Sequence, residues 1–204
     1  MAFTVFKGEV ANKYGLTAGH CYKNSRPSVY STPHYFGQVQ DAQYTSDRDS
    51  ALIKSVDDNW NLSIITGDVK SHSQRTIRGT WKPGNGKQVC LGGSFTGEVC
   101  EVTIRSSTPR CYEFEVQGQE VTRCGLVAGQ KIGSRIVQPG DSGGPVYRKA
   151  GSSFADAVGI IIGGGSTTNN GDRDMVYYRP IAQVLNDQGV ELFTCHNEAP
   201  EVCS

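Results

Sequence analysis

The chain has 204 residues, and its 20 lysines and arginines balance its 20 aspartates and glutamates. A chain of this length can bury one substantial core or two small lobes packed together. The balanced charge gives no net field that would favour nucleic acid or an anionic membrane as a partner. The longest apolar stretch, Ala157 to Gly165, is short and rich in glycine, so the sequence excludes a transmembrane helix.

Short runs of β-branched and aromatic residues alternate with turn clusters that contain many of the 25 glycines. The clearest of these runs are residues 62–66, 99–104, 112–121 and 175–178. The run that begins at Tyr112 alternates apolar and polar residues with the period of a half-buried strand. Only Pro180 to Val190 is predicted to be helical, with its apolar residues on one face and Gly189 as a stop signal. This pattern predicts an all-β sandwich or barrel with a short C-terminal helix.

A polar, glycine-rich stretch, Trp81 to Lys87, lies near the middle of the chain. We interpret it as the crossover between two β lobes, residues 1–83 and residues 84–204. The alternative interpretation is a long hairpin loop within a single sandwich.

Seven cysteines are more than a chain of this size usually carries in a reducing compartment. Their spacing does not match a zinc site, and no metal is expected. Short-range pairs are available, although the sequence does not fix the connectivity: Cys90 with Cys100, Cys111 with Cys124, and Cys195 with Cys203. Cys21 is then left over. The pattern favours disulfide-stapled hairpins in an oxidising, extracellular location.

The most informative segment runs from Gln138 to Val146 and reads QPGDSGGPV. A serine hydroxyl becomes an effective nucleophile when it is held in place next to a base, and Ser142 lies at the centre of this segment. The surrounding glycines allow a tight turn in which the amides of Gly140 and Ser142 converge on one point. Such amides can stabilise an oxyanion, which makes the segment a candidate acyl-transfer site. The alternative is a glycine-serine turn without function.

A serine nucleophile requires a base, and the chain has four histidines. His20 lies in the segment Gly15 to Cys21, where an apolar strand gives way to small residues that can fix an imidazole. The other three lie in polar or terminal segments and are predicted to be solvated: His34, His72 and His196. His20 is therefore the predicted base.

The imidazole in turn requires a carboxylate that fixes its tautomer and stabilises the imidazolium. Asp47 and Asp49 are both available, and Asp49 comes directly before the apolar strand that starts at Ser50. Asp47 lies further out and is predicted to be solvated. We therefore predict Asp49 as the third member of the site.

The segments Thr17 to Cys21, Asp49 to Leu52 and Gly140 to Pro145 resemble the three signature segments of chymotrypsin-fold serine proteases. Their order along the chain, His then Asp then Ser, is that of this family and differs from the order in subtilisins and α/β-hydrolases. Residues 89–100 resemble the disulfide loop of the bacterial branch, the streptogrisin and α-lytic-protease group. Residues 157–165 are similar to the strand that pairs with the substrate backbone and lines the specificity pocket.

The resemblance implies two packed six-stranded antiparallel β-barrels with the active site between them, a short C-terminal helix, and no metal or organic cofactor. It implies a secreted monomer that hydrolyses protein or peptide substrates through an acyl-enzyme on Ser142, with His20 moving the proton. Nucleic acid and membrane are not expected as partners.

The resemblance also indicates which residues contact the substrate. We predict an apolar P1 preference, because Ile136 stands where a carboxylate would select Arg or Lys, although Arg135 nearby could change this. The predicted substrate-binding residues are Ile136, Pro139, Ile162, Gly163, Gly164 and Gly165.

Four features depart from the family pattern. Cys21 has no cysteine before it to pair with, which implies a fragment without signal peptide, pro-region and first strand. An Ile-Val-Gly-Gly start is also absent. Leu91 replaces a basic residue that would neutralise Asp141, so that carboxylate requires another partner. Ile162 replaces a serine that contacts the catalytic carboxylate.

Two other functions compete with an active endopeptidase. A binding or adhesion module on the same scaffold would keep the groove without turnover, and Ile162 together with the missing first strand favours it. The complete set of His20, Asp49 and Ser142 argues against it. An esterase on an α/β-hydrolase fold is disfavoured by the order of these residues and by the scarcity of helices.

Overall fold

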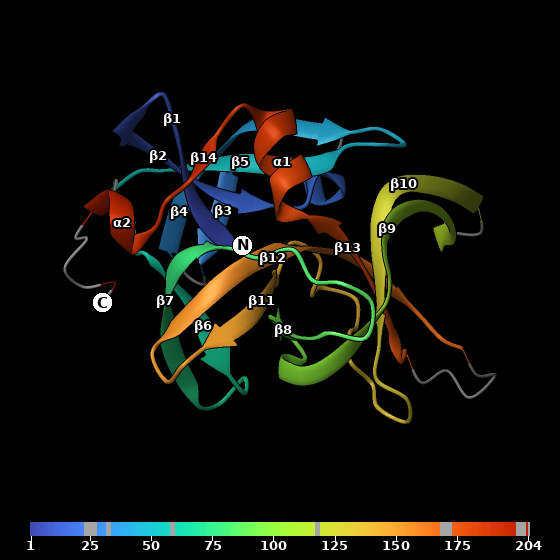
Figure 1. Ribbon diagram of the computed structural model, residues 1–204. Coiled ribbons are helices and arrows are strands. Elements are labelled where there is room, and N and C mark those ends of the chain that lie inside the picture. Colours follow the sequence, from blue (N-terminus) through green and yellow to red (C-terminus); the bar gives the residue numbers. More distant parts are fainter. Residues whose placement is uncertain are drawn as a thin grey trace.

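The computed structural model describes residues 1–22, 28–31, 34–57, 60–116, 119–167, 173–198 and 203. The described strands form two sheets, which lie one above the other in Figure 1. The strands of the first sheet are β1 (Phe3–Lys7), β2 (Glu9–Thr17), β3 (Ser28–Ser31), β4 (His34–Tyr44), β5 (Asp49–Ser55) and β14 (Glu191–Leu192). Those of the second are β6 (Ser63–Gly67), β7 (His72–Thr80), β8 (Gln88–Gly93), β9 (Gly97–Val116), β10 (Gln119–Gln130), β11 (Pro145–Ala150), β12 (Phe154–Gly165) and β13 (Met175–Pro180).

The predicted all-β architecture is confirmed. The first sheet has six strands in the order β14-β1-β2-β5-β4-β3. The second has eight described strands rather than the predicted six, in the order β11-β8-β9-β10-β13-β12-β7-β6 with an additional β11–β12 pairing. The largest apolar cluster contains Phe3 and Leu16 from the first sheet together with Ile64 and Ile77 from the second. The two sheets therefore pack against one another through a shared core.

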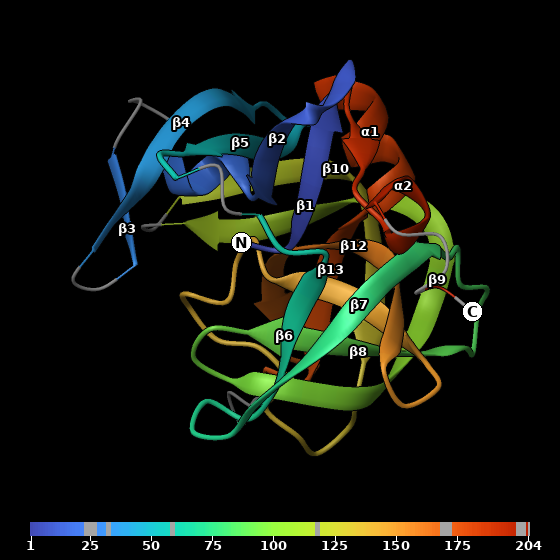
Figure 2. The same cartoon turned by 90° about the vertical axis from the view of Figure 1, so that its left-hand side faces the viewer.

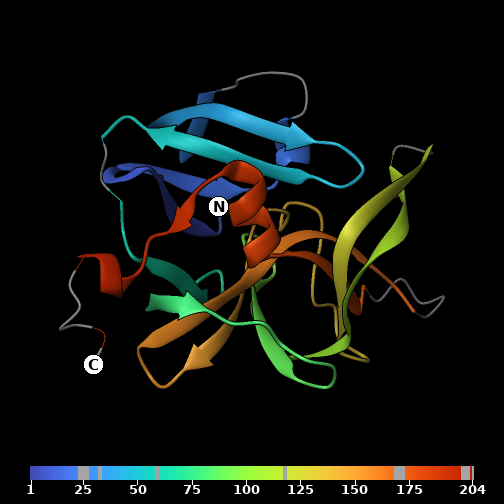
Figure 3. The same ribbon diagram turned by 45° about the horizontal axis from the view of Figure 1, so that its top comes forward.

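The segment Trp81–Lys87, predicted as the crossover between two lobes, joins β7 to β8, and both of these strands belong to the second sheet. The chain passes from one sheet to the other between β5 and β6. The reason is a long-range pairing: β7 runs parallel to β12, with Thr76 opposite Phe154. The predicted lobe boundary at residue 83 does not coincide with the division into sheets. The C-terminal segment returns to the first sheet, where Leu192 of β14 lies opposite Val5 of β1 (Figure 3).

The run predicted at residues 112–121 contains the end of β9 and the start of β10, with residues 117 and 118 outside the described part. Tyr112 and Phe114 are half-buried and Glu113 and Glu115 are exposed, as the predicted alternation requires. The two long strands form a hairpin that projects from the second sheet (Figures 1 and 3). A disulfide between Cys111 and Cys124 ties the two strands together.

The predicted C-terminal helix is confirmed as α1 (Ile181–Gln188). It ends at Gly189, which adopts the left-handed conformation (φ 62°) that favours glycine. The side chain of Gln188 donates a hydrogen bond of 2.8 Å to Ser50 Oγ on β5. This contact anchors α1 to the first sheet, beside which it lies in Figure 2. A second, shorter helix is α2 (Cys195–Glu198).

The structure forms the three predicted disulfides, Cys90–Cys100, Cys111–Cys124 and Cys195–Cys203. Cys21 is a free, exposed thiol. No helix in the described ranges has the length and apolar character needed to cross a membrane.

Candidate active site

His20 and Asp49 are brought together by the pairing of β2 with β5. The register places Thr17 opposite Ala51, so the one-turn helix Gly19–Tyr22 that follows β2 lies beside the start of β5. His20 Nδ1 lies 2.9 Å from Asp49 Oδ2. The backbone N–H of His20 donates to Asp49 Oδ1 over 2.8 Å. Both carboxylate oxygens therefore hold the histidine, one through Nδ1 of the ring and the other through the backbone N–H.

The environment of the pair favours the protonated imidazole. The Asp49 side chain is 4% exposed and that of His20 is 27% exposed. Burial lowers the pKa of His20, but the hydrogen bonds to Asp49 and Cys21, and the electrostatic interactions with both, outweigh burial and raise it above the ordinary value of 6.5. Asp49 can therefore stabilise an imidazolium at this position.

The other predicted candidates lie apart from this pair. Asp47 is exposed and accepts a hydrogen bond of 2.8 Å from Thr45 Oγ1. His72 and His196 are exposed, as predicted for solvated histidines. His34 begins β4, and its side chain lies outside the described part of the structure.

The segment that carries Ser142 turns tightly between residue 137 and β11. Gly140 (φ 98°) and Gly143 (φ 78°) both adopt conformations that disfavour other residues. A Cβ atom on Gly143 would overlap Thr17 Oγ1 and would lie 2.7 Å from the backbone N of Ala18. Thr17 and Ala18 lead into the turn that carries His20. The absence of a side chain at Gly143 thus allows the serine segment of the second sheet to meet the histidine segment of the first.

The polar groups of the serine segment divide into two sets. The backbone N–H groups of Asp141 and Gly143 donate to the carbonyls of Gln138 and Ile161, over 3.1 and 2.8 Å. In the described part of the chain, the N–H groups of Gly140 and Ser142 donate to no other protein atom. The hydroxyl of Ser142, which is half-buried, donates to the carbonyl of Ile162 over 3.4 Å rather than to His20.

Asp141 has a partner that the sequence analysis missed. Its buried carboxylate accepts hydrogen bonds from the N–H groups of Phe95 (2.8 Å), Thr96 (3.1 Å) and Gln138 (2.9 Å). The hydroxyl of Thr96 donates a fourth. These four donors satisfy the Asp141 carboxylate, a role that the family pattern gives to a basic residue at the position of Leu91.

The predicted substrate-binding residues belong to two parts of the chain, the approach to Ser142 and the end of β12. Ile136 and Ile162 are buried, at 1% and 7% exposure, whereas Pro139 is exposed. The glycines at the end of β12 are half-buried and lie opposite Tyr177, Val176 and Met175 of β13. Among the described strands, β13 is the only partner of residues 163–165, so the other edge of β12 is open there.

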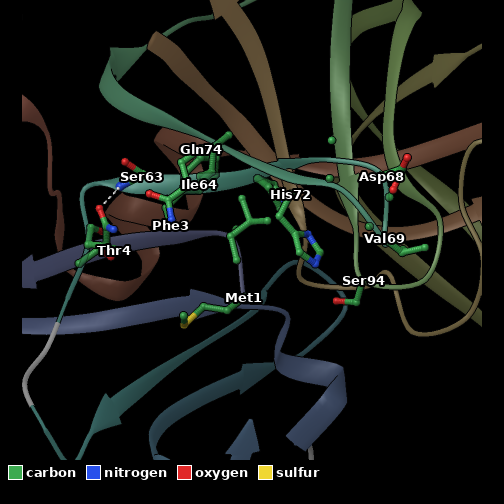
Figure 4. A pocket seen from close by; sticks show the side chains of 18 of the residues that line it. Met1, Phe3, Thr4, Ser63, Ile64, Asp68, Val69, His72, Gln74 and Ser94 are labelled. Atoms are coloured by element: carbon green, nitrogen blue, oxygen red, sulfur yellow. Dashed lines mark hydrogen bonds between the residues drawn. The ribbon is translucent and has the colours of Figure 1, made fainter. Parts of the chain in front are cut away.

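A cavity of about 410 Å³ lies between β1, the β6–β7 hairpin and the turn after β8. Figure 4 shows its lining, which includes Phe3, Ile64, His72 and Ser94. Neither His20, Asp49 nor Ser142 lines it, so this cavity is separate from the candidate site.

Three solved protease structures share the fold of this chain. A Nocardiopsis protease is 23% identical, with 95% of this chain and 91% of that chain covered and a TM-score of 0.68. Thermobifida fusca protease A is 24% identical, with 95% and 90% covered and a TM-score of 0.69. A glutamic acid-specific serine protease is 22% identical, with 94% and 91% covered and a TM-score of 0.68.

No curated protein sequence matches the chain. The trypsin family, in contrast, matches residues 9–186, which is most of its length. The chain belongs to the trypsin family of serine-type endopeptidases.

Proposed function

We propose that the protein is an endopeptidase in which Ser142 is the nucleophile, His20 the general base and Asp49 the carboxylate that orients His20. The single observation that carries this proposal is the convergence of two segments from different sheets. His20 is held by both oxygens of Asp49. The turn that presents Ser142 packs on Thr17 and Ala18, just before that histidine.

The reaction begins when the Ser142 hydroxyl turns from the Ile162 carbonyl towards His20 Nε2. Hydrogen bonds of this kind are often unformed without substrate and tighten when substrate binds. Ser142 Oγ then attacks the peptide carbonyl carbon while His20 takes the hydroxyl proton. The carbonyl oxygen becomes an oxyanion, which accepts hydrogen bonds from the unused N–H groups of Gly140 and Ser142.

The intermediate collapses when His20 gives the proton to the departing amine and the C–N bond breaks. This leaves an acyl ester on Ser142. A water molecule attacks the ester with His20 again acting as the base, and the carboxylic acid product leaves with Ser142 restored. Asp49 stabilises the imidazolium formed in each half, consistent with its raising of the His20 pKa.

The open edge of β12 supports an extended peptide as the substrate. Residues 163–165 pair only with β13 among the described strands, and Gly163 and Gly165 are the residues proposed to bind the substrate backbone at the opposite edge. A peptide that adds as a strand there gains main-chain hydrogen bonds independent of its sequence. The three disulfides support an extracellular, oxidising location for this activity.

A binding module on the same scaffold is the competing function. The hydrogen bond from Ser142 to the Ile162 carbonyl favours it, because a serine fixed in that position would not attack. The module would bind peptides at β12 without cleaving them.

Hydrolysis of an internally quenched peptide library by the wild type, Ser142→Ala and His20→Ala separates the two functions. We expect turnover by the wild type and a loss of about 10⁴-fold or more in each variant, because the members of a triad act as a unit. Ser152→Ala, at an exposed serine, is the control and should keep full activity. A folded wild type that binds peptides but releases no product would overturn the endopeptidase proposal in favour of the binding module.

A further inference from the structure

Two segments flank the position that a peptide carbonyl would occupy at Ser142. One is the approach to the nucleophile, residues 136–138, and the other is the end of β12, residues 163–165. The serine turn that follows the first segment is joined to the strand that leads into the second, because Gly143 N–H donates to the Ile161 carbonyl (2.8 Å) and Ile161 N–H donates to the Gly144 carbonyl (2.9 Å). A peptide strand on the open edge of β12 would direct the side chain before the scissile bond between these two segments.

The space between the two segments is already occupied by Val137. A Cβ atom on Gly164 would overlap Val137 Cγ1 and would lie 3.1 Å from the Met175 carbonyl oxygen. The Val137 side chain is 3% exposed, so it is packed rather than free to swing out. The valine methyl thus fills the place that a side chain at Gly164 would take.

Residues that pack in the same cluster as Val137 are themselves buried. Ile136 is 1% exposed and Ile161 is fully buried. Both belong with Val137 to one apolar core cluster. Forcing additional methylene groups into such a packed region pushes side chains out of their preferred rotamers and shifts the backbone, which is unfavourable.

We propose that Val137 is a specificity-determining residue that limits the substrate to a small P1 side chain, glycine or alanine. This rests on the proposed endopeptidase function and narrows the apolar preference predicted from Ile136. Ile136 is packed in the same buried cluster as Val137, so it offers no free space to a large apolar P1 side chain. A small side chain fits at the entrance to the space between the two segments without displacing Val137.

The test is kcat/KM for a series of peptide p-nitroanilides that differ only at P1, which is Gly, Ala, Val, Leu, Phe, Glu or Arg. For the wild type we expect the alanine peptide to exceed the phenylalanine peptide by about tenfold or more, the discrimination that a few methylene groups provide. Val137→Gly should open the space between the two segments and raise kcat/KM for the phenylalanine peptide about tenfold or more. The kcat/KM for the alanine peptide should stay within a few-fold of the wild-type value. Val137→Ala should give an intermediate shift and serves if the glycine variant does not fold.

Val127→Ala is the matched control, since Val127 is a 3% exposed valine of the same core cluster on β10. It should lower stability without changing the order of P1 preferences. A wild type that prefers Leu, Phe, Glu or Arg at P1, or position 137 variants that keep the wild-type order, would overturn the inference and leave the proposed function intact. A wild type that neither cleaves any peptide in the series nor reacts with a fluorophosphonate would overturn both.

Discussion

Asp49 and Asp141 are both buried carboxylates at the candidate site, with exposures of 3% and 1%, yet they are held in different ways. Asp49 is hydrogen-bonded to the ring and to the backbone N–H of His20, and this imidazole ring can gain or lose a proton. Asp141 meets three backbone N–H groups and the Thr96 hydroxyl. In the described ranges, no cation pairs with it. The first carboxylate is placed to act on a proton, and the second is placed to fix the backbone around Ser142.

The local chain explains this difference. Asp141 is enclosed by the turn that follows β8, and the turn comes so close that a Cβ atom on Gly93 would lie 2.5 Å from the Asp141 carboxyl carbon. Backbone amides satisfy a buried carboxylate without a second charge that must itself be desolvated. We therefore predict that substitutions at Asp49 lower activity more than stability. Substitutions among the donors to Asp141 should lower stability first.

The largest expected effect is that of Asp49→Asn. The amide can leave His20 in the wrong tautomer and cannot stabilise its charged form, so we expect kcat to fall about 10⁴-fold. Unfolding in guanidinium should show a much smaller change. Asp47→Asn, two residues away at an exposed position, is the control and should retain activity. If both variants were equally active, Asp49 would have no role in catalysis.

Thr96→Val should have the next largest effect. The isosteric valine removes the hydroxyl donor to Asp141 and leaves one lone pair of a buried carboxylate without its partner, which costs about 1–3 kcal/mol in the free energy of unfolding. Chemical denaturation monitored by circular dichroism measures it, and Thr108→Val at an exposed position is the control. An unchanged unfolding free energy would show that the backbone amides suffice.

The titration of His20 makes activity and stability depend on pH in opposite directions. Because the folded state raises the pKa of His20 above 6.5, protonation of His20 stabilises the fold. This contribution is complete below pH 6.5 and is lost as the pH rises through the folded pKa. Catalysis needs the neutral imidazole, so kcat/KM should rise over that same range, with an acid limb whose midpoint lies above 6.5.

A pH–rate profile measured together with unfolding free energies from pH 5 to 10 tests both the predicted rise in kcat/KM and the predicted fall in stability. His20→Ala should remove the fall in stability across the limb. Cys21→Ala should move the limb to lower pH, because Cys21 also raises the pKa of His20. An acid limb centred below 6.5 would contradict this account of the pair.

The sequence predicted those parts of the site that are encoded in short segments. Ser142, His20 and Asp49 each lie in a segment whose small residues and neighbouring strand are visible in the sequence, and the structure joins the last two directly. The donors to Asp141 were missed because Thr96 lies 45 positions away, and because the other donors, from Phe95 and Gln138, are backbone N–H groups that any residue except proline carries.

Contacts between segments far apart in the sequence could not be predicted for a related reason. The place of β7 in the second sheet could not be predicted, because its parallel pairing with β12 joins segments whose sequences give no sign of each other. Val137 likewise was not singled out, because its importance comes from meeting Gly164 of a different strand.

Covalent labelling by a fluorophosphonate, followed by mass spectrometry of the peptides, tests whether Ser142 is an activated nucleophile. We predict one adduct per chain, on Ser142, formed more slowly in His20→Ala and absent in Ser142→Ala. A folded wild type that gains no adduct, or gains it on another residue, would contradict the assignment of Ser142 as an activated nucleophile.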